Sequence, residues 1–315
     1  MTERILLLYP LTPDQRHRLD ALDAEFYTPD TYQDATGPIT SIFGWSALGD
    51  QVLKDPRNQV HWIQTFSAGI DYLPLDWLAE HQVALTNASG VYSPAIAEST
   101  IGYLLYFLRG FDGALQNQAG HFWQQPNRND LHSLSEQRVV IYGTGSIGQA
   151  IAKLLRGFGN APYGVNRTGH PVDGFRQTVS LDHDAELLKD ADIVINNMPA
   201  TDATIHYFNA AFFQQLTGLR VFVNVGRGSS VNTTALMQAL DKGEVLNAAL
   251  DVFETEPLPR ESKLWDYANV LITPHQTGFS VANNRPIFEL FYQNLTSYLA
   301  DGHLAVNQVD PQRGY

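Results

Sequence analysis

The sequence contains no cysteine among its 315 residues. This absence excludes disulfide bonds, thiolate metal ligands and a cysteine nucleophile, and we expect no metal site. Basic residues are also few, with 20 Lys and Arg against 33 Asp and Glu, which gives a formal net charge of −13. An acidic surface argues against nucleic acid or an anionic membrane as a partner, and an anionic substrate would need local positive groups.

Long apolar runs are absent as well. The run at residues 5–8 is too short for a signal peptide and is followed by Pro10. The stretch at 101–108 is far shorter than the ~20 residues that a membrane-spanning helix needs. We therefore expect a cytoplasmic protein. A length of 315 residues, with 44% apolar residues and 24 glycines, is typical of a soluble α/β protein with two domains.

A glycine-rich turn follows a short β-branched strand at residues 138–142. Gly143 would allow the tight turn, Gly145 the approach of the backbone to a pyrophosphate, and Gly148 the close packing of helix on sheet. Glycine-rich turns are common, but the helical apolar spacing at 147–155 favours a dinucleotide-binding turn whose helix start holds the diphosphate. The residues expected to contact the cofactor here are Gly143, Gly145, Ser146, Ile147 and Gly148.

The end of the next expected strand indicates which dinucleotide is bound. An acidic residue for the adenosine ribose usually lies about 20 residues beyond the glycines, but this chain has Asn166, Arg167 and Thr168 there. A carboxylate would repel a 2′-phosphate, whereas Arg167 offers a planar fork that matches one, with Asn166 and Thr168 as neutral donors. We predict NADP(H) as the preferred cofactor. NAD(H) stays possible if Arg167 is only a solvated loop cation.

Strand-like and helical segments alternate along the first part of the chain. They are followed by a long apolar helix at 93–108, which we interpret as a bridge between two domains, and by an irregular, polar segment at 110–136. In the first domain we expect strands at 4–9, 39–45, 60–65 and 83–87 and helices near 13–22, 46–53 and 75–81.

The alternation continues beyond the glycine-rich turn and predicts a parallel, doubly wound sheet. A last helix at 282–299 is expected to pack on the first domain and make it discontinuous. The predicted fold class is α/β, with two Rossmann-like doubly wound parallel-sheet domains and a cleft between them. The substrate-binding domain would comprise 1–98 and 287–315, and the dinucleotide-binding domain 99–286. The later strands are expected at 161–165, 192–198, 220–225, 247–252 and 269–273, and the helices at 184–189, 209–216 and 233–242.

Three charged or titratable residues follow the last three of these strands, at the edge where open α/β sheets bind ligands. They are Arg227, Glu256 and His275. Arg227 can bind a substrate carboxylate bidentately and polarise the neighbouring carbonyl. His275 can give or take a proton near neutral pH, and Glu256 can hydrogen-bond its other ring nitrogen. Each residue alone is typical of an ordinary loop, but the three together indicate hydride transfer beside a nicotinamide.

Four motifs stand in a fixed order: GTGSIG at 143–148, NVGRG at 224–228, DVFETEPLP at 251–259 and TPH at 273–275. In this order and spacing they resemble the NAD(P)-dependent D-isomer-specific 2-hydroxyacid dehydrogenases, and the resemblance covers nearly the whole chain. It implies that Arg227, Glu256 and His275 are catalytic and that Asp251 binds the nicotinamide carboxamide. The implied reaction reduces a small anionic 2-keto acid to the D-2-hydroxy acid in a homodimer whose domains close over the substrate.

The resemblance also implies where the substrate binds. The segment TFSAGID at 65–71 is similar to the family's substrate loop, in which the N–H groups of Ala68 and Gly69 would hold the carboxylate together with Arg227. Tyr92 lies in a stretch that matches D-lactate-type members. It would contact the substrate side chain or else belong to a helix-capping turn.

Two other functions stay open. A formate dehydrogenase shares the architecture, the histidine and the arginine, but that group has glutamine at the position of Glu256. A cofactor-sensing scaffold like the transcriptional corepressors shares the fold and the trio, although no basic segment or long disordered tail is evident here. Turnover of pyruvate, phenylpyruvate and hydroxypyruvate would separate an enzyme from a scaffold.

Overall fold

The computed structural model describes residues 2–311 and divides into two compact units. Unit 1 contains residues 2–92 and 280–311, and unit 2 contains residues 93–279. The divisions lie before helices α4 (Ser93–Leu108) and α10 (Asn284–Asp301), whereas the sequence-based boundaries at 98/99 and 286/287 fall inside these helices. A helix packs as one hydrogen-bonded body, so each of the two helices belongs whole to a single unit.

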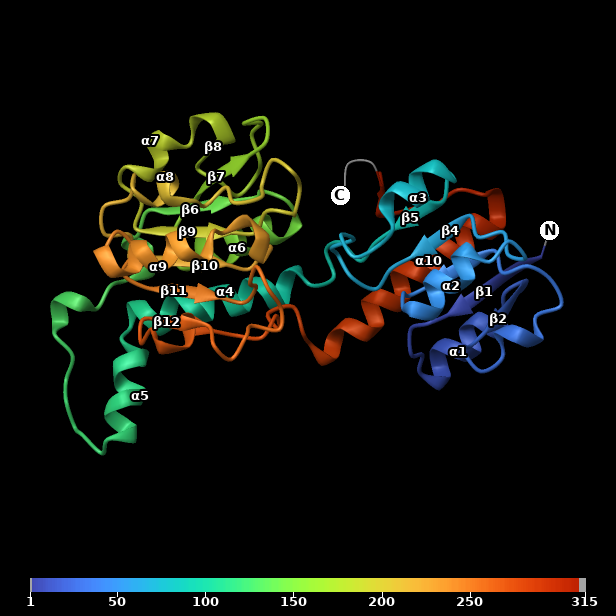
Figure 1. Cartoon of the computed structure of the whole chain (residues 1–315), viewed down its shortest axis with the longest axis horizontal. Coiled ribbons are helices and arrows are strands. Elements are labelled where there is room, and N and C mark those ends of the chain that lie inside the picture. The colour runs from blue at the N-terminus through green and yellow to red at the C-terminus, as the bar shows by residue number, and fades with distance from the viewer. Residues whose placement is uncertain (1, 312–315) are drawn as a thin grey trace. The chain divides into compact units, whose positions relative to one another are not determined.

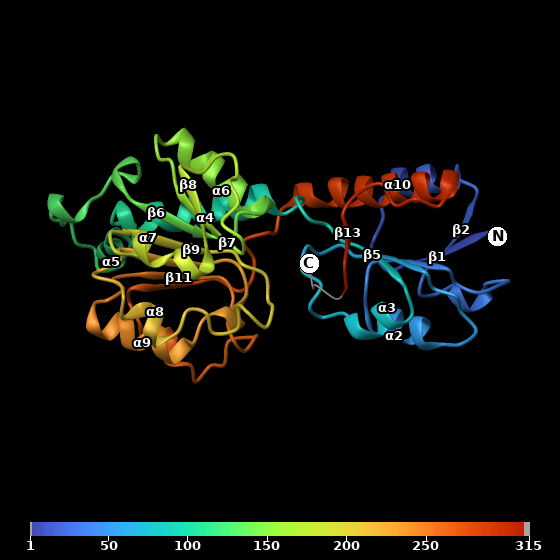
Figure 2. The same ribbon diagram turned by 90° about the horizontal axis from the view of Figure 1, so that it is seen from above.

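Unit 1 is built on a six-stranded sheet in the order β13-β5-β4-β3-β1-β2, parallel except for the antiparallel pair β13 and β5. Helices α1 and α10 pack on one face of the sheet and α2 and α3 on the other (Figure 2). The strands are β1 (Glu3–Leu7), β2 (Ala24–Tyr27), β3 (Ser41–Phe43), β4 (Trp62–Gln64), β5 (Ala84–Thr86) and β13 (Gln308–Val309). The other helices are α1 (Pro13–Asp20), α2 (Ala47–Lys54) and α3 (Leu75–Glu80).

Helix α10 is fixed to the sheet of unit 1 by aromatic stacking and by a buried amide. The ring of Phe291 stacks on Phe43 with 3.9 Å between centroids. Asn294 is fully buried, and its Nδ2 donates to Gln64 Oε1 at 3.0 Å and to Val306 O at 3.1 Å. Because each polar group of this buried amide has a partner, Asn294 can hold the helix against β4.

Unit 2 is built on a seven-stranded, wholly parallel sheet in the order β12-β11-β10-β9-β6-β7-β8 (Figure 1). The chain leaves β6 toward one edge and then returns through β9 toward the other, which makes the β6/β9 boundary a topological switch point. The strands are β6 (Val139–Tyr142), β7 (Tyr163–Asn166), β8 (Gln177–Ser180), β9 (Ile193–Asn196), β10 (Val221–Asn224), β11 (Ala248–Leu250) and β12 (Val270–Ile272). The other helices are α5 (Phe111–Ala119), α6 (Ser146–Gly157), α7 (Ala185–Leu188), α8 (Ala210–Phe213) and α9 (Thr233–Lys242).

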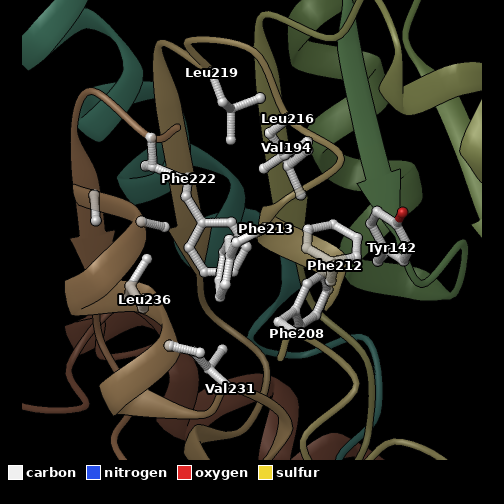
Figure 3. Close-up of a cluster of buried hydrophobic side chains, with 14 of the residues drawn as sticks. Tyr142, Val194, Phe208, Phe212, Phe213, Leu216, Leu219, Phe222, Val231 and Leu236 are labelled. Carbon is white, nitrogen blue, oxygen red and sulfur yellow. The ribbon is translucent and has the colours of Figure 1, made fainter. Parts of the chain in front are cut away.

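A cluster of aromatic side chains forms much of the core on one face of this sheet (Figure 3). The ring of Phe208 packs edge to face on Phe212 and Phe222, with centroids 4.7 and 5.2 Å apart. Tyr142 joins the cluster, and its hydroxyl donates to Asp184 Oδ2 at 2.5 Å. Burial raises the pKa of Tyr142 well above its ordinary value. Since Tyr142 is the residue before Gly143, the glycine-rich turn begins on a rigid base.

The expected fold class is confirmed, but several elements differ from the sequence-based prediction. Residues 110–136 were expected to be irregular, yet α5 occupies Phe111–Ala119. None of its residues is buried, and its apolar residues at helical spacing, Phe111, Ala114 and Leu115, span little more than one turn, which is too short to predict a helix. Strands β2, β8 and β13 were also not expected, because short, partly exposed edge strands carry little apolar alternation. Within residues 2–311, no helix combines the length and apolarity that crossing a membrane requires.

Candidate active site

The glycine-rich turn between β6 and α6 is tightly packed at two glycines and open at the third. Gly143 has φ +93°, and a Cβ on Gly148 would lie 2.0 Å from Gly143 O, so neither position accepts a side chain. A Cβ on Gly145 would meet no atom within 4 Å. The N–H groups of Ser146 and Ile147 begin α6 and have no intrahelical acceptor. Within residues 2–311, the turn therefore presents open space and N–H donors without an acceptor where a diphosphate would bind.

Asn197 supports this turn and was not predicted from the sequence. Its Nδ2 donates to Tyr142 O at 2.8 Å and to Gly143 O at 2.9 Å. Asn197 directly follows β9, the neighbour of β6 across the switch point. The only signal in the sequence is a polar residue at a strand end, and the pairing with β6 that gives it meaning is a property of the sheet.

Of the three residues predicted to contact the 2′-phosphate in the loop after β7, two are already hydrogen-bonded within residues 2–311 and one is not. Asn166 Nδ2 donates to Thr144 Oγ1 at 3.1 Å and to His170 O at 3.0 Å, so one N–H binds the glycine-rich turn and the other binds the loop itself. The hydroxyl of Thr168 lies 2.9 Å from His170 Nδ1. Arg167 is exposed, and in the described part of the chain its guanidinium has no hydrogen-bond or ion-pair partner. Arg167 is thus the available cation, while Asn166 shapes the loop that carries it.

Arg227 lies in a loop after β10 that is fixed by a buried polar network. Its carbonyl accepts hydrogen bonds from Ser230 Oγ at 2.6 Å and Asn224 Nδ2 at 3.2 Å. Asn196 Nδ2 in turn donates to Asn224 Oδ1 at 2.8 Å and to Ser230 Oγ at 2.7 Å. Asn196, Asn224 and Ser230 are almost fully buried, so their hydrogen bonds strongly define the backbone of Arg227.

The loop of Arg227 touches the loop that carries Glu256. A Cβ on Gly228 would lie 1.9 Å from the carbonyl carbon and oxygen of Phe253, so the two backbones meet at this glycine. The loops that carry Arg227, Glu256 and His275 therefore lie at the same edge of the sheet, because β10, β11 and β12 are adjacent and parallel.

Glu256 and His275 form a hydrogen-bonded pair. Glu256 Oε2 lies 2.8 Å from His275 Nδ1, and Glu256 Oε1 accepts from the N–H of Phe253 at 2.9 Å. The imidazole is half exposed, with 52% of its side-chain surface accessible, so Nε2 is the nitrogen left to exchange a proton with a ligand. The structure thus brings together the acid and the histidine that the sequence placed on different loops.

A second His–Glu pair anchors the same loop to helix α9. His206 Nε2 lies 2.6 Å from Glu254 Oε1, and the N–H of Thr233 donates to Glu254 Oε2 at 2.8 Å. Burial raises the pKa of Glu254, but the hydrogen bonds from Thr233 and His206 outweigh it and lower the pKa overall. Sequence reasoning did not find this anchor, because His206 is distant in the chain and lies in no motif.

Asp251 is almost fully buried and is engaged with the loop that carries His275. Its carboxylate accepts four hydrogen bonds, and its main-chain carbonyl accepts a fifth, from the N–H of His275 at 2.8 Å. The four donors to the carboxylate are Thr273 Oγ1 at 2.6 Å, Gln276 N at 2.9 Å, Thr277 N at 3.1 Å and Thr277 Oγ1 at 2.6 Å. The nicotinamide contact implied by the resemblance would have to share an acceptor that is already in full use.

The substrate loop predicted in unit 1 directs its carbonyl groups toward the protein. Within residues 2–311, the N–H groups of Ala68 and Gly69 have no acceptor. Two amides left without partners in one turn can bind an anion. The carbonyls of residues 66–69 accept hydrogen bonds from Tyr92 Oη (to Phe66), Thr65 Oγ1 and Ala88 N (to Ser67), Asn87 Nδ2 (to Ala68) and Ser67 Oγ (to Gly69).

Tyr92 therefore has a role in this loop that neither prediction for it included. Its hydroxyl donates to Phe66 O and its ring packs against the core of unit 1. Burial raises the pKa of Tyr92 to about 12, so the hydroxyl stays a donor at neutral pH.

Among the described residues, no three His, Asp or Glu side chains are grouped to bind a metal ion.

A wholly parallel sheet with a glycine-rich turn at its switch point defines unit 2 as a dinucleotide-binding α/β domain. The family model for the D-isomer specific 2-hydroxyacid dehydrogenase NAD-binding domain matches residues 101–277, more than half of the chain. The chain belongs to the D-isomer specific 2-hydroxyacid dehydrogenase family, as the motifs predicted.

Named relatives show how broad this family is. The chain is 29% identical over 288 residues to glyoxylate/hydroxypyruvate reductase B of Escherichia fergusonii, covering 90% of this chain and 89% of that protein. It is 37% identical to phosphoglycerate dehydrogenase from Lactobacillus plantarum, with a TM-score of 0.60 over 98% of this chain and 100% of that one. An NADPH-dependent glyoxylate/hydroxypyruvate reductase from Sinorhizobium meliloti, solved with NADP and malonate, is 28% identical, with a TM-score of 0.77 over 99% and 98% of the chains.

Proposed function

We propose that this protein is an NADPH-dependent reductase that converts small 2-keto acids to D-2-hydroxy acids. The observation that carries the proposal is the pairing of Glu256 with His275 at 2.8 Å, on a loop that touches the loop of Arg227. A histidine oriented by a carboxylate can protonate an alkoxide, and a neighbouring guanidinium can bind the carboxylate of the same substrate.

In this mechanism His275 is the proton donor. Glu256 fixes the ring through Nδ1, which leaves Nε2 to deliver its proton to the keto oxygen of the substrate. A bound nicotinamide supplies the hydride. After transfer, the neutral imidazole keeps a proton on Nδ1 that it donates to Glu256, and Nε2 takes up a proton from solvent before the next turnover.

Arg227 would bind the substrate carboxylate and polarise the adjacent carbonyl. The open N–H groups of Ala68 and Gly69 would bind a carboxylate oxygen as well, and Tyr92 would act on the loop carbonyl of Phe66 rather than on the substrate side chain. Reductases named for glyoxylate and hydroxypyruvate among the relatives support a small substrate.

The NADPH preference rests on Arg167. Its exposed guanidinium is available for a 2′-phosphate, and no acidic side chain occupies the end of β7. The relative from Sinorhizobium meliloti is named NADPH-dependent and was solved with NADP, which supports the same preference. Gly143, Gly145, Ser146, Ile147 and Gly148 would hold the diphosphate.

Initial rates with glyoxylate, hydroxypyruvate, pyruvate and phenylpyruvate, each with NADPH and NADH, test the proposal. We expect turnover of the smaller acids, a higher kcat/KM with NADPH, and the D-enantiomer by chiral chromatography. Cofactor binding without turnover of any keto acid would favour a sensing scaffold, and oxidation of formate would favour the formate dehydrogenase alternative. Either result would refute the proposed reaction.

We also propose a homodimer. The segment at 111–123 exposes four large apolar side chains to solvent in the single chain, and such a cluster is typical of a contact surface. These are Phe111, Leu115, Phe122 and Trp123. Light scattering coupled to size exclusion tests this: a mass near twice 35.1 kDa is expected, and a monomer at micromolar concentration would contradict it.

A further inference from the structure

We infer that Asp251 is a positioning residue that sets the orientation of His275. The inference rests on the proposed function, because it assigns the role of His275 to proton transfer. It concerns residues of unit 2 alone.

Asp251 makes five hydrogen bonds to the loop at 273–277. The carboxylate accepts hydrogen bonds from residues on both sides of His275, and the main-chain carbonyl of Asp251 accepts the N–H of His275 itself. The N–H of Asp251 donates to Asn224 O at 3.0 Å, which ties the arrangement to β10. The position of the imidazole is thereby linked to the sheet through one side chain.

His275 needs this support because its backbone is strained. Its φ is +51°, a left-handed conformation that costs a non-glycine residue on the order of 1 kcal/mol. Such a conformation persists only where surrounding contacts fix it. The hydrogen bonds to Asp251 and one from His275 N to Thr273 O at 3.1 Å supply those contacts.

Helix α4 supports the same loop from the other side. Tyr103 Oη lies 2.6 Å from Thr273 Oγ1, whose proton is directed to Asp251, so the tyrosine is the donor. Ser99 Oγ donates to Thr277 O at 3.3 Å. The loop is therefore held between α4 and Asp251, while the carboxylate of Asp251 faces inward and is only 1% exposed.

The geometry makes Asp251→Asn a specific test. Each carboxylate oxygen accepts one main-chain N–H, from Gln276 or from Thr277. Asparagine has one oxygen and one NH₂ group, so either orientation of its amide leaves a main-chain N–H facing another donor. The loop must then shift, although the volume of the side chain is unchanged. A displacement of the catalytic group by about 1 Å can reduce turnover about 100-fold.

The experiment compares Asp251→Asn, Thr277→Val and the double variant with wild type. We expect kcat to fall about 10- to 100-fold in Asp251→Asn, and less but in the same direction in Thr277→Val. NADPH affinity, measured by tryptophan fluorescence, should change less than about 2-fold. The double variant should be no slower than Asp251→Asn alone, because both substitutions break the same network. Thr100→Val is the matched control: Thr100 is also buried in unit 2, and its hydroxyl donates only to Ile96 O of its own helix.

A second readout does not depend on turnover. The ¹⁵N signal of His275 Nδ1 reports its hydrogen bond to Glu256, and it should shift in Asp251→Asn and in Thr277→Val but not in Thr100→Val. If wild type reduces no keto acid, the proposed function fails, while this signal still decides the positioning role. The inference is overturned if the signal is unchanged in Asp251→Asn, or if that variant loses NADPH affinity at normal kcat while Thr277→Val behaves as wild type.

Discussion

Gly228 offers the most direct test of how the candidate active site is assembled. It is buried, and it is the point where the loop of Arg227 meets the backbone at Phe253, three residues before Glu256. In Gly228→Ala the new Cβ would lie 1.9 Å from the carbonyl carbon and oxygen of Phe253, whereas real Cβ contacts stay above 3.0 Å. The two loops must therefore separate by about 1 Å, since backbone atoms cannot move away by a change of rotamer.

This separation of the two loops predicts a lower kcat/KM for the keto acid. Moving Arg227 about 1 Å relative to Glu256 and His275 should reduce kcat/KM for the keto acid about 100-fold. NADPH affinity should be nearly unchanged, because the glycine-rich turn lies after β6 and the atoms nearest to the added Cβ belong to Phe253. The overpacked site should also lower the free energy of unfolding by about 1–3 kcal/mol. Steady-state kinetics, fluorescence titration with NADPH and thermal unfolding measure these three quantities.

Gly157→Ala is the matched control for this substitution. Gly157 is exposed on α6, and a Cβ there would meet no atom within 4 Å. We expect wild-type kcat/KM and a gain in stability of up to about 1 kcal/mol, since alanine is the better helix former. Folded Gly228→Ala protein with wild-type kcat/KM would refute the contact between the loops as the basis of the site.

Other substitutions test separate parts of the molecule. Arg167→Ser should raise KM for NADPH about 10- to 100-fold and change KM for NADH little, since the ion pair between the guanidinium and the 2′-phosphate is lost. Equal changes of KM for both cofactors would reject the phosphate role. Tyr92→Phe should raise KM for the keto acid about 10-fold, because the hydrogen bond from the hydroxyl to Phe66 O is lost. The control is Tyr298→Phe in the same core, which should leave KM unchanged. Equal KM values in the two variants would contradict the role of the Tyr92 hydroxyl. Burial raises the pKa of Glu3, but His61, whose Nε2 lies 3.5 Å from Glu3 Oε2, and hydrogen bonds from the hydroxyls of Thr40 and Ser41 lower it overall from 4.5. The contribution of Glu3 to stability is therefore present above that pH and is lost as pH falls through the lowered pKa. Urea unfolding should therefore show Glu3→Gln about 1–2 kcal/mol less stable than wild type at pH 6 and the difference closing toward pH 3; a difference independent of pH would contradict this.

The sequence contained the local signals that define the fold class and the family. Buried parallel strands appear as short apolar runs, and β6, β9 and β10 are recognisable because every residue in them is buried. The glycine spacing after β6 was readable for the same local reason, since tight turns restrict the residue type. The roles of Arg227, Glu256 and His275 stay predictions, although the structure places Glu256 and His275 in hydrogen-bonding contact.

Contacts between distant segments were not readable in this way. Asn197 and His206 carry no motif, and the motif around Tyr92 did not indicate its hydrogen bond to Phe66 O. Each of the three residues contacts a partner that is remote in the chain or across a strand pair. Helix α5 was missed because its apolar spacing covers only residues 111–115, little more than one turn.

Asp251 shows most clearly what could be predicted from the sequence and what depended on the tertiary structure. Local order along the chain indicated a strand near Asp251, but the expected strand at 247–252 included this residue, whereas β11 ends at Leu250. That its carboxylate meets four donors from residues 273–277 depends on the parallel pairing of β11 with β12, which brings two loops to one edge. Sequence by itself determined which chemical groups stand at the strand ends. Only the tertiary structure decided which of them bind one another, because hydrogen bonds act over about 3 Å in space and not along the chain.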